Sequence, residues 1–188
     1  HFFKAHEKAC LAKADYSVCV TYKAKEIIQS RTDLPNQPVQ VEVIPCSADM
    51  DLFNPKKVDP LQKAAFASAL NITGDDFVIT YLGSLGGWYL TDEMMHFCKA
   101  VADKIPKAKF LFIVPDSQRT VAAAAAKYGL ADGQVIVQHG KRHEVPVLLS
   151  FSNYAVFFIK PCYSKQASSP TKHGEIMSMG IPVITNSG

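Results

Sequence analysis

The stretch FVITYLGSLGG, residues 77–87, is a continuous apolar run that passes directly into a glycine-rich turn. Similar apolar runs follow it, separated by helical patterns: the runs lie at 109–114, 134–137, 154–159 and 182–185, and the helical patterns near 91–104, 117–128, 143–151 and 171–179. Continuous apolar strands that alternate with helices are typical of a parallel sheet buried on both faces. We therefore predict an α/β fold with a doubly wound parallel sheet, whose ligands bind beyond the carboxyl ends of the strands.

The residues before this series form a different pattern. Ala, Lys, Glu and aliphatic residues at helical spacing predict helices over 3–14 and 22–30, and β-rich runs predict strands over 17–21 and 39–44. Asp59 and Pro60 then provide an N-cap and a first helical residue for a helix that reaches Leu70. We expect a domain boundary near residues 44–58.

Length and charge limit the classes of protein that fit. A chain of 188 residues with 48% apolar and 20% charged residues can bury a sizeable core. Its net charge of +3 is far below what a nucleic-acid-binding surface needs, so no nucleic-acid partner is expected. The whole basic excess lies between Lys141 and Glu175.

The sequence predicts a cytoplasmic protein. It contains no run of 18 apolar residues, and its first residues lack the pattern of a signal peptide. Its five cysteines are scattered and form neither a disulfide framework nor a CxxC metal site, which fits a reducing compartment. Because the chain begins without Met and stops soon after Ile184, we expect a fragment of a longer protein.

The loop Gly83-Ser84-Leu85-Gly86 is the first candidate for ligand binding. Where a strand enters a glycine-rich turn before a helix, backbone amides can close on a phosphate. The glycine spacing matches neither GxGxxG nor a P-loop. An ordinary tight turn between strand and helix is the alternative interpretation.

The second candidate is the short helix predicted to begin at Thr171 and to end before Gly180. Lys172 lies in its first turn, where a cation opposes the helix dipole, so a negatively charged ligand would explain its presence. Glu175 lies one turn further on nearly the same face. The alternative for Glu175 is a capping carboxylate of the same helix.

Several motifs occur in one order along the chain: IPCSAD at 44–49 with FNP at 53–55, the Gly83 loop, HG at 139–140 with VPVLL at 145–149, and the stretch from Glu175 to Ile184. In this order the sequence resembles the retaining nucleotide-sugar glycosyltransferases of family 4, which have the two-domain GT-B fold. The subgroup with similar loops resembles bacterial surface-polysaccharide transferases. The resemblance covers essentially the whole chain.

The resemblance implies that residues 1–44 are the tail of the N-terminal acceptor-side domain, and that 45–188 are a Rossmann-like donor-binding domain, so that the fold is incomplete at both ends. It implies transfer of a sugar, of hexosyltransferase type, from a UDP- or GDP-sugar to a glycan or lipid-linked acceptor with retention. No cofactor and no metal are expected. The whole protein is expected in the cytoplasm, where it could associate peripherally with the inner face of the plasma membrane. The fragment alone is expected to be inactive.

The resemblance also implies roles for individual residues. Glu175 matches the second glutamate of the E-x7-E motif, which holds the ribose hydroxyls. The amides at Ser169, Thr171 and Lys172 would meet the diphosphate together with the Gly83 loop, and Arg142 is a candidate contact to the base. Catalytic residues are not assigned.

The sequence departs from the family pattern at three positions. Ala167 replaces the first glutamate of the motif, Ser84 stands where a phosphate-binding arginine is usual, and Tyr89 lies near where a lysine would fall. Our hypothesis is that Lys172 replaces the two missing cations, because a diphosphate leaving group needs stabilisation as charge develops on its oxygen. A nucleotide-sugar-binding module without catalysis, or another GT-B enzyme such as a sugar-nucleotide epimerase, are the alternatives.

Overall fold

The protein divides into two units, His1–Ser47 with Pro161–Pro170, and Ala48–Lys160 with Thr171–Gly188. The computed structural model describes residues 2–35, 38–165 and 167–187. The change of unit after Ser47 lies three residues beyond the expected 44/45 boundary. Residues 161–170 are grouped with the first unit, and the Lys4 ammonium lies 5.9 Å from the centroid of the Tyr163 ring in that segment. The division into an acceptor-side tail and a donor-binding domain stays a prediction.

The first unit is built on two short parallel strands, β1 (Ser17–Cys19) and β2 (Val41–Val43), with helices α1 (Phe2–Lys13) and α2 (Tyr22–Gln29). Its core consists of Cys19, Leu34, Val39 and Val41. The Thr21 hydroxyl caps α2 by accepting from Ala24 N at 3.1 Å and donates to the Ala167 carbonyl at 3.3 Å. That bond joins the 161–170 segment, which contains the short 3-10 helix η2 (Tyr163–Lys165), to this unit.

The second unit contains a parallel sheet of five strands in the order β5-β4-β3-β6-β7. The strands are β3 (Phe77–Leu82), β4 (Ala108–Ile113), β5 (Val135–Gln138), β6 (Tyr154–Val156) and β7 (Val183–Ile184). The chain runs outward from β3 to β5 and then returns to place β6 on the other side of β3. The order of the strands therefore reverses between β3 and β6, where a doubly wound sheet opens a crevice for ligands.

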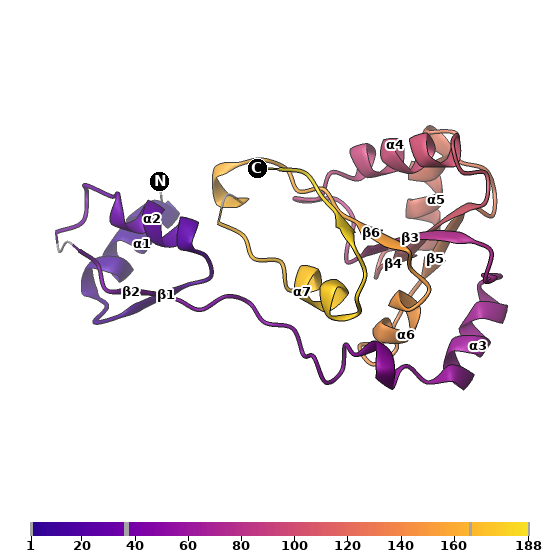
Figure 1. Ribbon diagram of the computed structural model, residues 1–188. Helices are drawn as coiled ribbons and strands as arrows, with labels where there is room; N and C mark the ends of the chain where they lie inside the picture. The colour runs from indigo at the N-terminus through magenta and orange to yellow at the C-terminus, as the bar shows by residue number, and fades with distance from the viewer. Residues whose placement is uncertain (1, 36–37, 166, 188) are drawn as a thin grey trace. The chain divides into compact units, whose positions relative to one another are not determined.

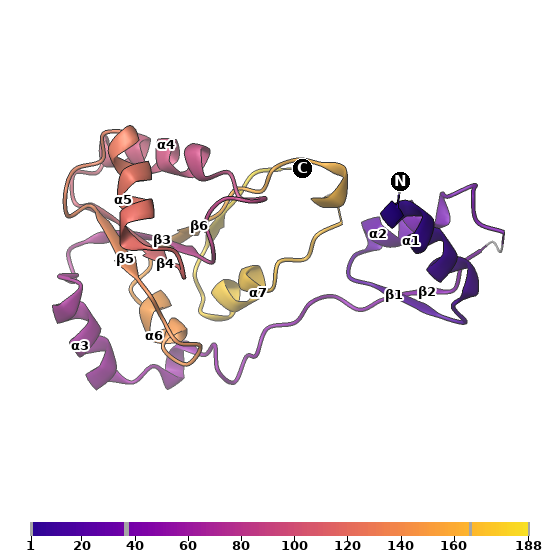
Figure 2. The same ribbon diagram turned by 180° about the vertical axis from the view of Figure 1, so that it is seen from behind.

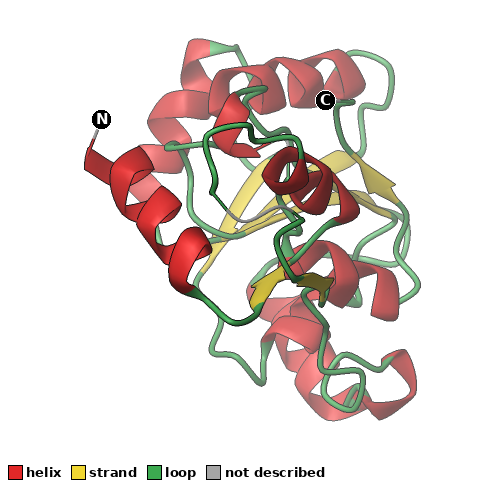
Figure 3. Cartoon of the chain, turned by 90° about the vertical axis from the view of Figure 1, so that its left-hand side faces the viewer, coloured by secondary structure: helices red, strands yellow, loops and turns green. Residues whose placement is uncertain are grey.

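Helices cover both faces of this sheet (Figures 1 and 2). One face carries α4 (Thr91–Ala102) and α5 (Gln118–Lys127), and the other carries α6 (Val145–Leu149) and α7 (Thr171–Ser178) with α3 (Pro60–Ala69) near them. Successive residues of a strand point to opposite faces, so Ile79 and Tyr81 join the first core and Val78 joins the second. Figure 3 shows the yellow strands between red helices. Within the described ranges, no helix has the length and apolar character needed to cross a bilayer.

The predicted α/β fold with a doubly wound parallel sheet is confirmed, and each predicted helix and strand is found. The largest difference is that β6 ends at Val156, three residues before the end of its apolar run. Ile159 leaves the sheet to pair with Tyr89. The Asn186 amide also holds the Ile159 backbone, accepting from its N at 2.8 Å and donating to its carbonyl at 3.0 Å.

Phe53 fixes the start of the second unit to its core. Its side chain is 1% exposed and belongs to the cluster of the α6 and α7 face, with Leu111 and Ile176. The short 3-10 helix η1 (Pro55–Lys57) follows, and Asp59 then caps α3 by accepting from Leu61 N at 2.9 Å. Of the motif residues 44–49 and 53–55, Phe53 is the one that joins the core, whereas residues 44–47 are exposed.

We expect Phe53→Ala to lower the free energy of unfolding of the second unit by about 3–5 kcal/mol, because it removes a fully buried ring and leaves a cavity. Leu61→Ala is the matched control, since Leu61 is 82% exposed and its truncation should change stability by less than about 0.5 kcal/mol. Urea unfolding followed by circular dichroism measures both. Equal losses for the two variants would contradict the placement of Phe53.

Candidate functional site

The glycine-rich loop after β3 is held in place by bonds within the second unit. Three of its amide hydrogens are engaged: Gly83 N donates to the Ile113 carbonyl at 3.0 Å, Leu85 N to Asp116 Oδ2 at 2.9 Å, and Gly86 N to Thr91 Oγ1 at 3.0 Å. The Ser84 carbonyl accepts from the Tyr81 hydroxyl at 2.5 Å. The loop is thus a tight turn whose shape the protein itself sets, and these three amides point into the fold.

Lys172, in the first turn of α7, reaches the end of β3. Its Nζ donates to the Leu82 carbonyl at 2.9 Å. Three aromatic rings surround this ammonium, with centroids at 4.6 Å for Tyr81, 3.6 Å for Tyr89 and 4.9 Å for Phe157. Tyr81 lies on β3 and Phe157 follows β6, so the cation lies where the order of the strands reverses.

Gly83 allows this close approach. Its φ of +117° is one that side-chain-bearing residues rarely adopt, and a Cβ there would lie 3.4 Å from Lys172 Nζ. A residue with a side chain would therefore strain the turn, although its Cβ would only come into ordinary van der Waals contact with the ammonium. The two candidate segments of the sequence, the Gly83 loop and the start of α7, meet at this point.

Burial changes the protonation equilibria of this cluster. Removal from water lowers the pKa of Lys172 to about 7, because the charged form loses its hydration. It raises the pKa of Tyr81 and of Tyr89, so both rings stay neutral. Among the described residues, no carboxylate forms an ion pair with Lys172. The end of β3 therefore holds a partly buried amine whose nearest neighbours are rings and a carbonyl.

Glu175 lies one turn further along α7 and pairs with the loop after β5. Its Oε1 accepts from Arg142 Nη1 at 2.6 Å, with the Glu175 side chain 7% and the Arg142 side chain 58% exposed. The guanidinium also lies 4.6 Å from the centroid of the Phe53 ring. Arg142 is thus bonded to Glu175, the residue that the family resemblance relates to ribose binding. The expected contact of Arg142 with a base stays a prediction.

Gly140 brings the loop that carries Arg142 close to α6. A Cβ at this position would lie 2.9 Å from Leu148 Cδ1, which is closer than side chains approach each other. The glycine therefore lets the chain after β5 pass against the core. Glu144 then closes the turn by accepting from Lys141 N at 2.7 Å.

The structure brings most of the predicted site residues together around α7. Lys172 touches the Gly83 loop, and Glu175 touches Arg142. Thr171 is the exposed first residue of the helix. Ser169 belongs to the segment grouped with the first unit, and its expected contact with a diphosphate stays a prediction.

The sequence did not reveal the residues that surround the ammonium and support the loop. Tyr81 and Phe157 lie in apolar runs, where an aromatic residue is normally part of the core, and only the strand order brings them together. Asp116 follows β4 without any motif that marks its bond to Leu85. A carboxylate just after a predicted parallel strand was the one available signal.

Asp49, Met50 and Asp51 spell a DxD pattern at the start of the second unit. Asp49 Oδ1 accepts from Asp51 N at 3.1 Å and from Leu52 N at 3.0 Å. The side chain of Asp49 thus forms an Asx-type turn. The described residues contain no cluster of three or more His, Cys, Asp or Glu side chains suited to a metal ion.

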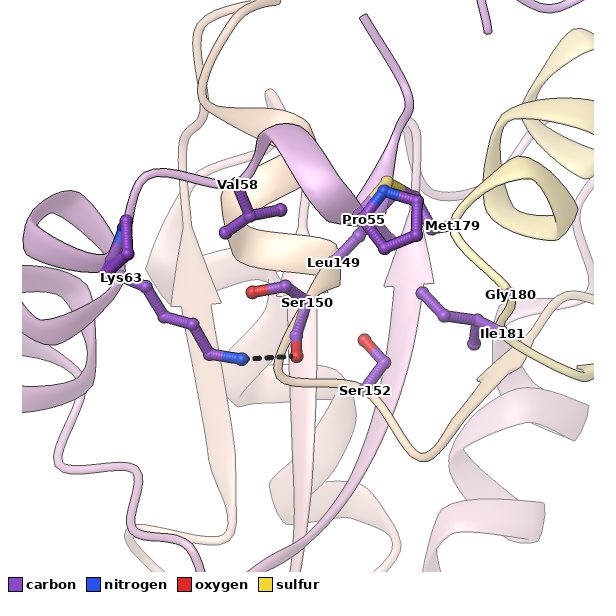
Figure 4. A pocket seen from close by; sticks show the side chains of 10 residues that line it. Pro55, Val58, Lys63, Leu149, Ser150, Ser152, Met179, Gly180 and Ile181 are labelled. Carbon is purple, nitrogen blue, oxygen red and sulfur yellow. Dashed lines mark hydrogen bonds between the residues drawn. The ribbon is translucent and has the colours of Figure 1, made fainter.

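A separate cavity of about 390 Å³ lies among α3, α6 and the segment after α7 (Figure 4). Lys63 borders it and donates to the Ser150 carbonyl at 3.0 Å. Ser152 and Ile181, which also border it, precede β6 and β7. The cavity is therefore at the amino ends of these strands, the opposite end from Lys172, and it is not where a doubly wound sheet binds its ligand.

No protein-family model and no curated protein matches this sequence. Solved structures do match. One is WaaG, a glycosyltransferase involved in lipopolysaccharide biosynthesis, with a TM-score of 0.74, 18% identity, and coverage of 97% of this chain and 48% of that one. Alr3699/HepE of Anabaena, solved with UDP-glucose, matches with a TM-score of 0.70, 15% identity, and 97% and 47% coverage.

A third similar structure is the C-terminal domain of LpcC, a glycosyl transferase group 1 family protein from Francisella tularensis. Its TM-score is 0.53, with 19% identity and coverage of 73% of this chain and 69% of that one. Structural matches at such low identity establish the fold alone. The second unit has the Rossmann-like fold of a GT-B C-terminal domain. The chain spans about half the length of WaaG and of HepE.

The buried amine predicts a pH-dependent stability difference. The pKa of Lys172 falls from 10.5 in the unfolded chain to about 7 in the folded one, so the unfolded state binds more protons between these values and stability rises with pH there. Lys172→Met removes this effect and keeps an apolar contact with the rings. We expect its melting temperature, relative to wild type, to be several degrees higher near pH 7 than near pH 10.

Melting curves followed by fluorescence across this pH range measure the difference. Lys160→Met is the control, since Lys160 is exposed and its substitution should give a difference that does not change with pH. A constant difference for Lys172→Met would contradict the placement of Lys172 in a buried site.

Proposed function

We propose that this chain is the donor-binding half of a retaining glycosyltransferase, which moves a sugar from a nucleoside diphosphate sugar to an acceptor in cell-surface polysaccharide synthesis. One observation carries the proposal: α7 places Lys172 at the reversal point of the sheet and Glu175 one turn away. A cation and a carboxylate at this spacing suit a diphosphate and the ribose beside it.

Lys172 is the proposed ligand of the diphosphate. A partly buried cation without an anionic partner loses hydration that nothing replaces, and a phosphate oxygen would supply the missing charge. The first amides of α7, at Thr171 and Lys172, lie at the positive end of the helix dipole and favour the same anion. During transfer, negative charge develops on the diphosphate leaving group, and the ammonium would stabilise it.

Glu175 is the proposed ligand of the ribose. A carboxylate can accept two hydrogen bonds from a vicinal diol, one on each oxygen. Arg142 already donates to Oε1 and so fixes the plane of the carboxylate before a donor arrives. The bond to Arg142 also keeps a nearly buried carboxylate from lacking a partner.

The loss of the two family cations is the departure that most needs an explanation. Ser84 and Tyr89 stand where an arginine and a lysine would be expected, and Tyr89 packs its ring on the Lys172 ammonium at 3.6 Å. Tyr89, near the position of the family lysine, therefore contacts Lys172 of α7. This contact supports the hypothesis that Lys172 replaces the missing cations.

We propose the donor and the acceptor from the similar structures. HepE was solved with UDP-glucose, and WaaG acts in lipopolysaccharide biosynthesis, which supports a UDP- or GDP-sugar as donor and a glycan or lipid-linked acceptor. We propose that the acceptor binds through the other half of the protein. The reaction would need no metal and would take place in the cytoplasm, at the inner face of the membrane where the acceptor is lipid-linked.

A panel of UDP, GDP, ADP and their sugars tests the donor site, because a ligand that binds the folded state raises the melting temperature. We expect one base to give a clear shift. Glu175→Gln should weaken binding of that nucleotide about 10-fold or more, since a charged hydrogen bond to the ribose is lost. Glu93→Gln, an exposed position on α4, is the matched control and should bind as wild type. No shift with any nucleotide would contradict the donor site.

Transfer by the full-length protein tests the activity. We expect Lys172→Ala to lower turnover with the preferred donor more than about 100-fold, because leaving-group stabilisation is lost, while Lys160→Ala, at an exposed position, stays close to wild type. Unchanged donor affinity and turnover in Lys172→Ala would contradict the proposal. Binding without transfer would favour a module that has lost catalysis, as Ala167 in the first motif position suggests, and an epimerised nucleotide sugar would identify an epimerase.

A further inference from the structure

Tyr89 makes the shortest ring contact in the cluster around Lys172. Its centroid lies 3.6 Å from Nζ, whereas those of Tyr81 and Phe157 lie more than 4 Å away. The backbone fixes this position, since Tyr89 N donates to the Gly86 carbonyl at 3.0 Å and Tyr89 pairs with Ile159. The ring also meets Tyr81 edge to face, at 6.0 Å and 76°.

Two opposing effects set the charge of an amine in this position. Burial favours the neutral form and lowers the pKa of Lys172 to about 7. The negative face of an aromatic ring attracts the ammonium and favours the charged form, most strongly where water is excluded. Because burial brings the pKa of Lys172 close to pH 7, a small further contribution from the rings changes the fraction of the amine that is charged.

We propose that Tyr89 is a positioning residue for Lys172: its ring holds the ammonium at the carboxyl end of β3 and keeps it protonated, ready for the donor diphosphate. The role of the diphosphate rests on the proposed function, whereas the hold on the ammonium does not. Tyr89 lies near the position where the family pattern has a lysine. In this chain its ring instead maintains the charge of Lys172.

Of the groups near the ammonium, Tyr89 is the one that we expect to affect the protonation of Lys172 most. Tyr81 on β3 is neutral, and Phe157 after β6 meets the His173 ring edge to face at 5.7 Å. Asp116 after β4 acts on Tyr81, whose pKa it helps to raise, and its carboxylate is bonded to Leu85 N. On α7 itself, Glu175 is paired with Arg142.

The test measures the pKa of Lys172 directly, by NMR of side-chain-labelled lysine in the full chain without ligand. Tyr89→Phe keeps the ring and should leave this pKa unchanged. Tyr89→Leu keeps the burial but removes the ring, and should lower the pKa by about 1. Tyr89→Met gives a second ring-free variant should the leucine variant fold poorly. Equal pKa values in the ring-free and phenylalanine variants would overturn the proposal.

Binding of UDP-glucose between about pH 6 and pH 8, the range that brackets an amine titrating near neutral pH, gives an independent reading. Wild type and Tyr89→Phe should lose affinity together as the pH rises, because the amine loses its proton. Tyr89→Leu should lose affinity at lower pH and recover toward wild type as the pH falls. An equal loss at every pH would show a merely structural role and overturn the proposal.

The two measurements separate the two proposals. If wild type binds none of the nucleotide sugars but the pKa of Lys172 falls in Tyr89→Leu, the proposed function fails and the hold on the ammonium stands. If UDP-glucose binding depends on Lys172 but both Tyr89 variants behave alike, the donor site stands and the role of Tyr89 fails.

Discussion

The hydrogen bond from Lys172 to the Leu82 carbonyl is the contact on which the arrangement of the site depends. It joins α7 to the end of β3 across the point where the strand order reverses. An ammonium in such a place loses most of its hydration, and only ring faces and a carbonyl replace it. The protein therefore keeps a cation where a doubly wound sheet binds its ligand, at a cost that an anionic ligand would offset.

The same helix explains why the second part of the site is where it is. Glu175 follows Lys172 by three residues and so lies on nearly the same face of α7. The Gly83 turn approaches the first of these residues and the loop after β5 approaches the second. Gly83 supplies the positive φ of its turn, and Gly140 supplies the space that its loop needs beside Leu148. One helix thus fixes the spacing between a group suited to a diphosphate and a group suited to a ribose.

Much of this arrangement could be predicted from the sequence, because continuous apolar runs such as 77–82 identify buried parallel strands and Asp59 with Pro60 identifies a helix start. Lys172 and Glu175 stood out by their chemistry. Tyr81 and Phe157 did not, since an aromatic residue in a strand looks the same whether it packs on a leucine or on an ammonium. The Thr21 bond to Ala167, which ties 161–170 to the first unit, depends on tertiary contact and leaves no local pattern.

A crystal structure of the full chain with bound UDP-glucose would locate the donor relative to α7. We expect a diphosphate oxygen within about 3 Å of Lys172 Nζ and the ribose hydroxyls at hydrogen-bond distance from the Glu175 carboxylate. A diphosphate that lies away from α7, for example in the cavity beside Lys63 at the amino ends of the strands, would contradict this expectation.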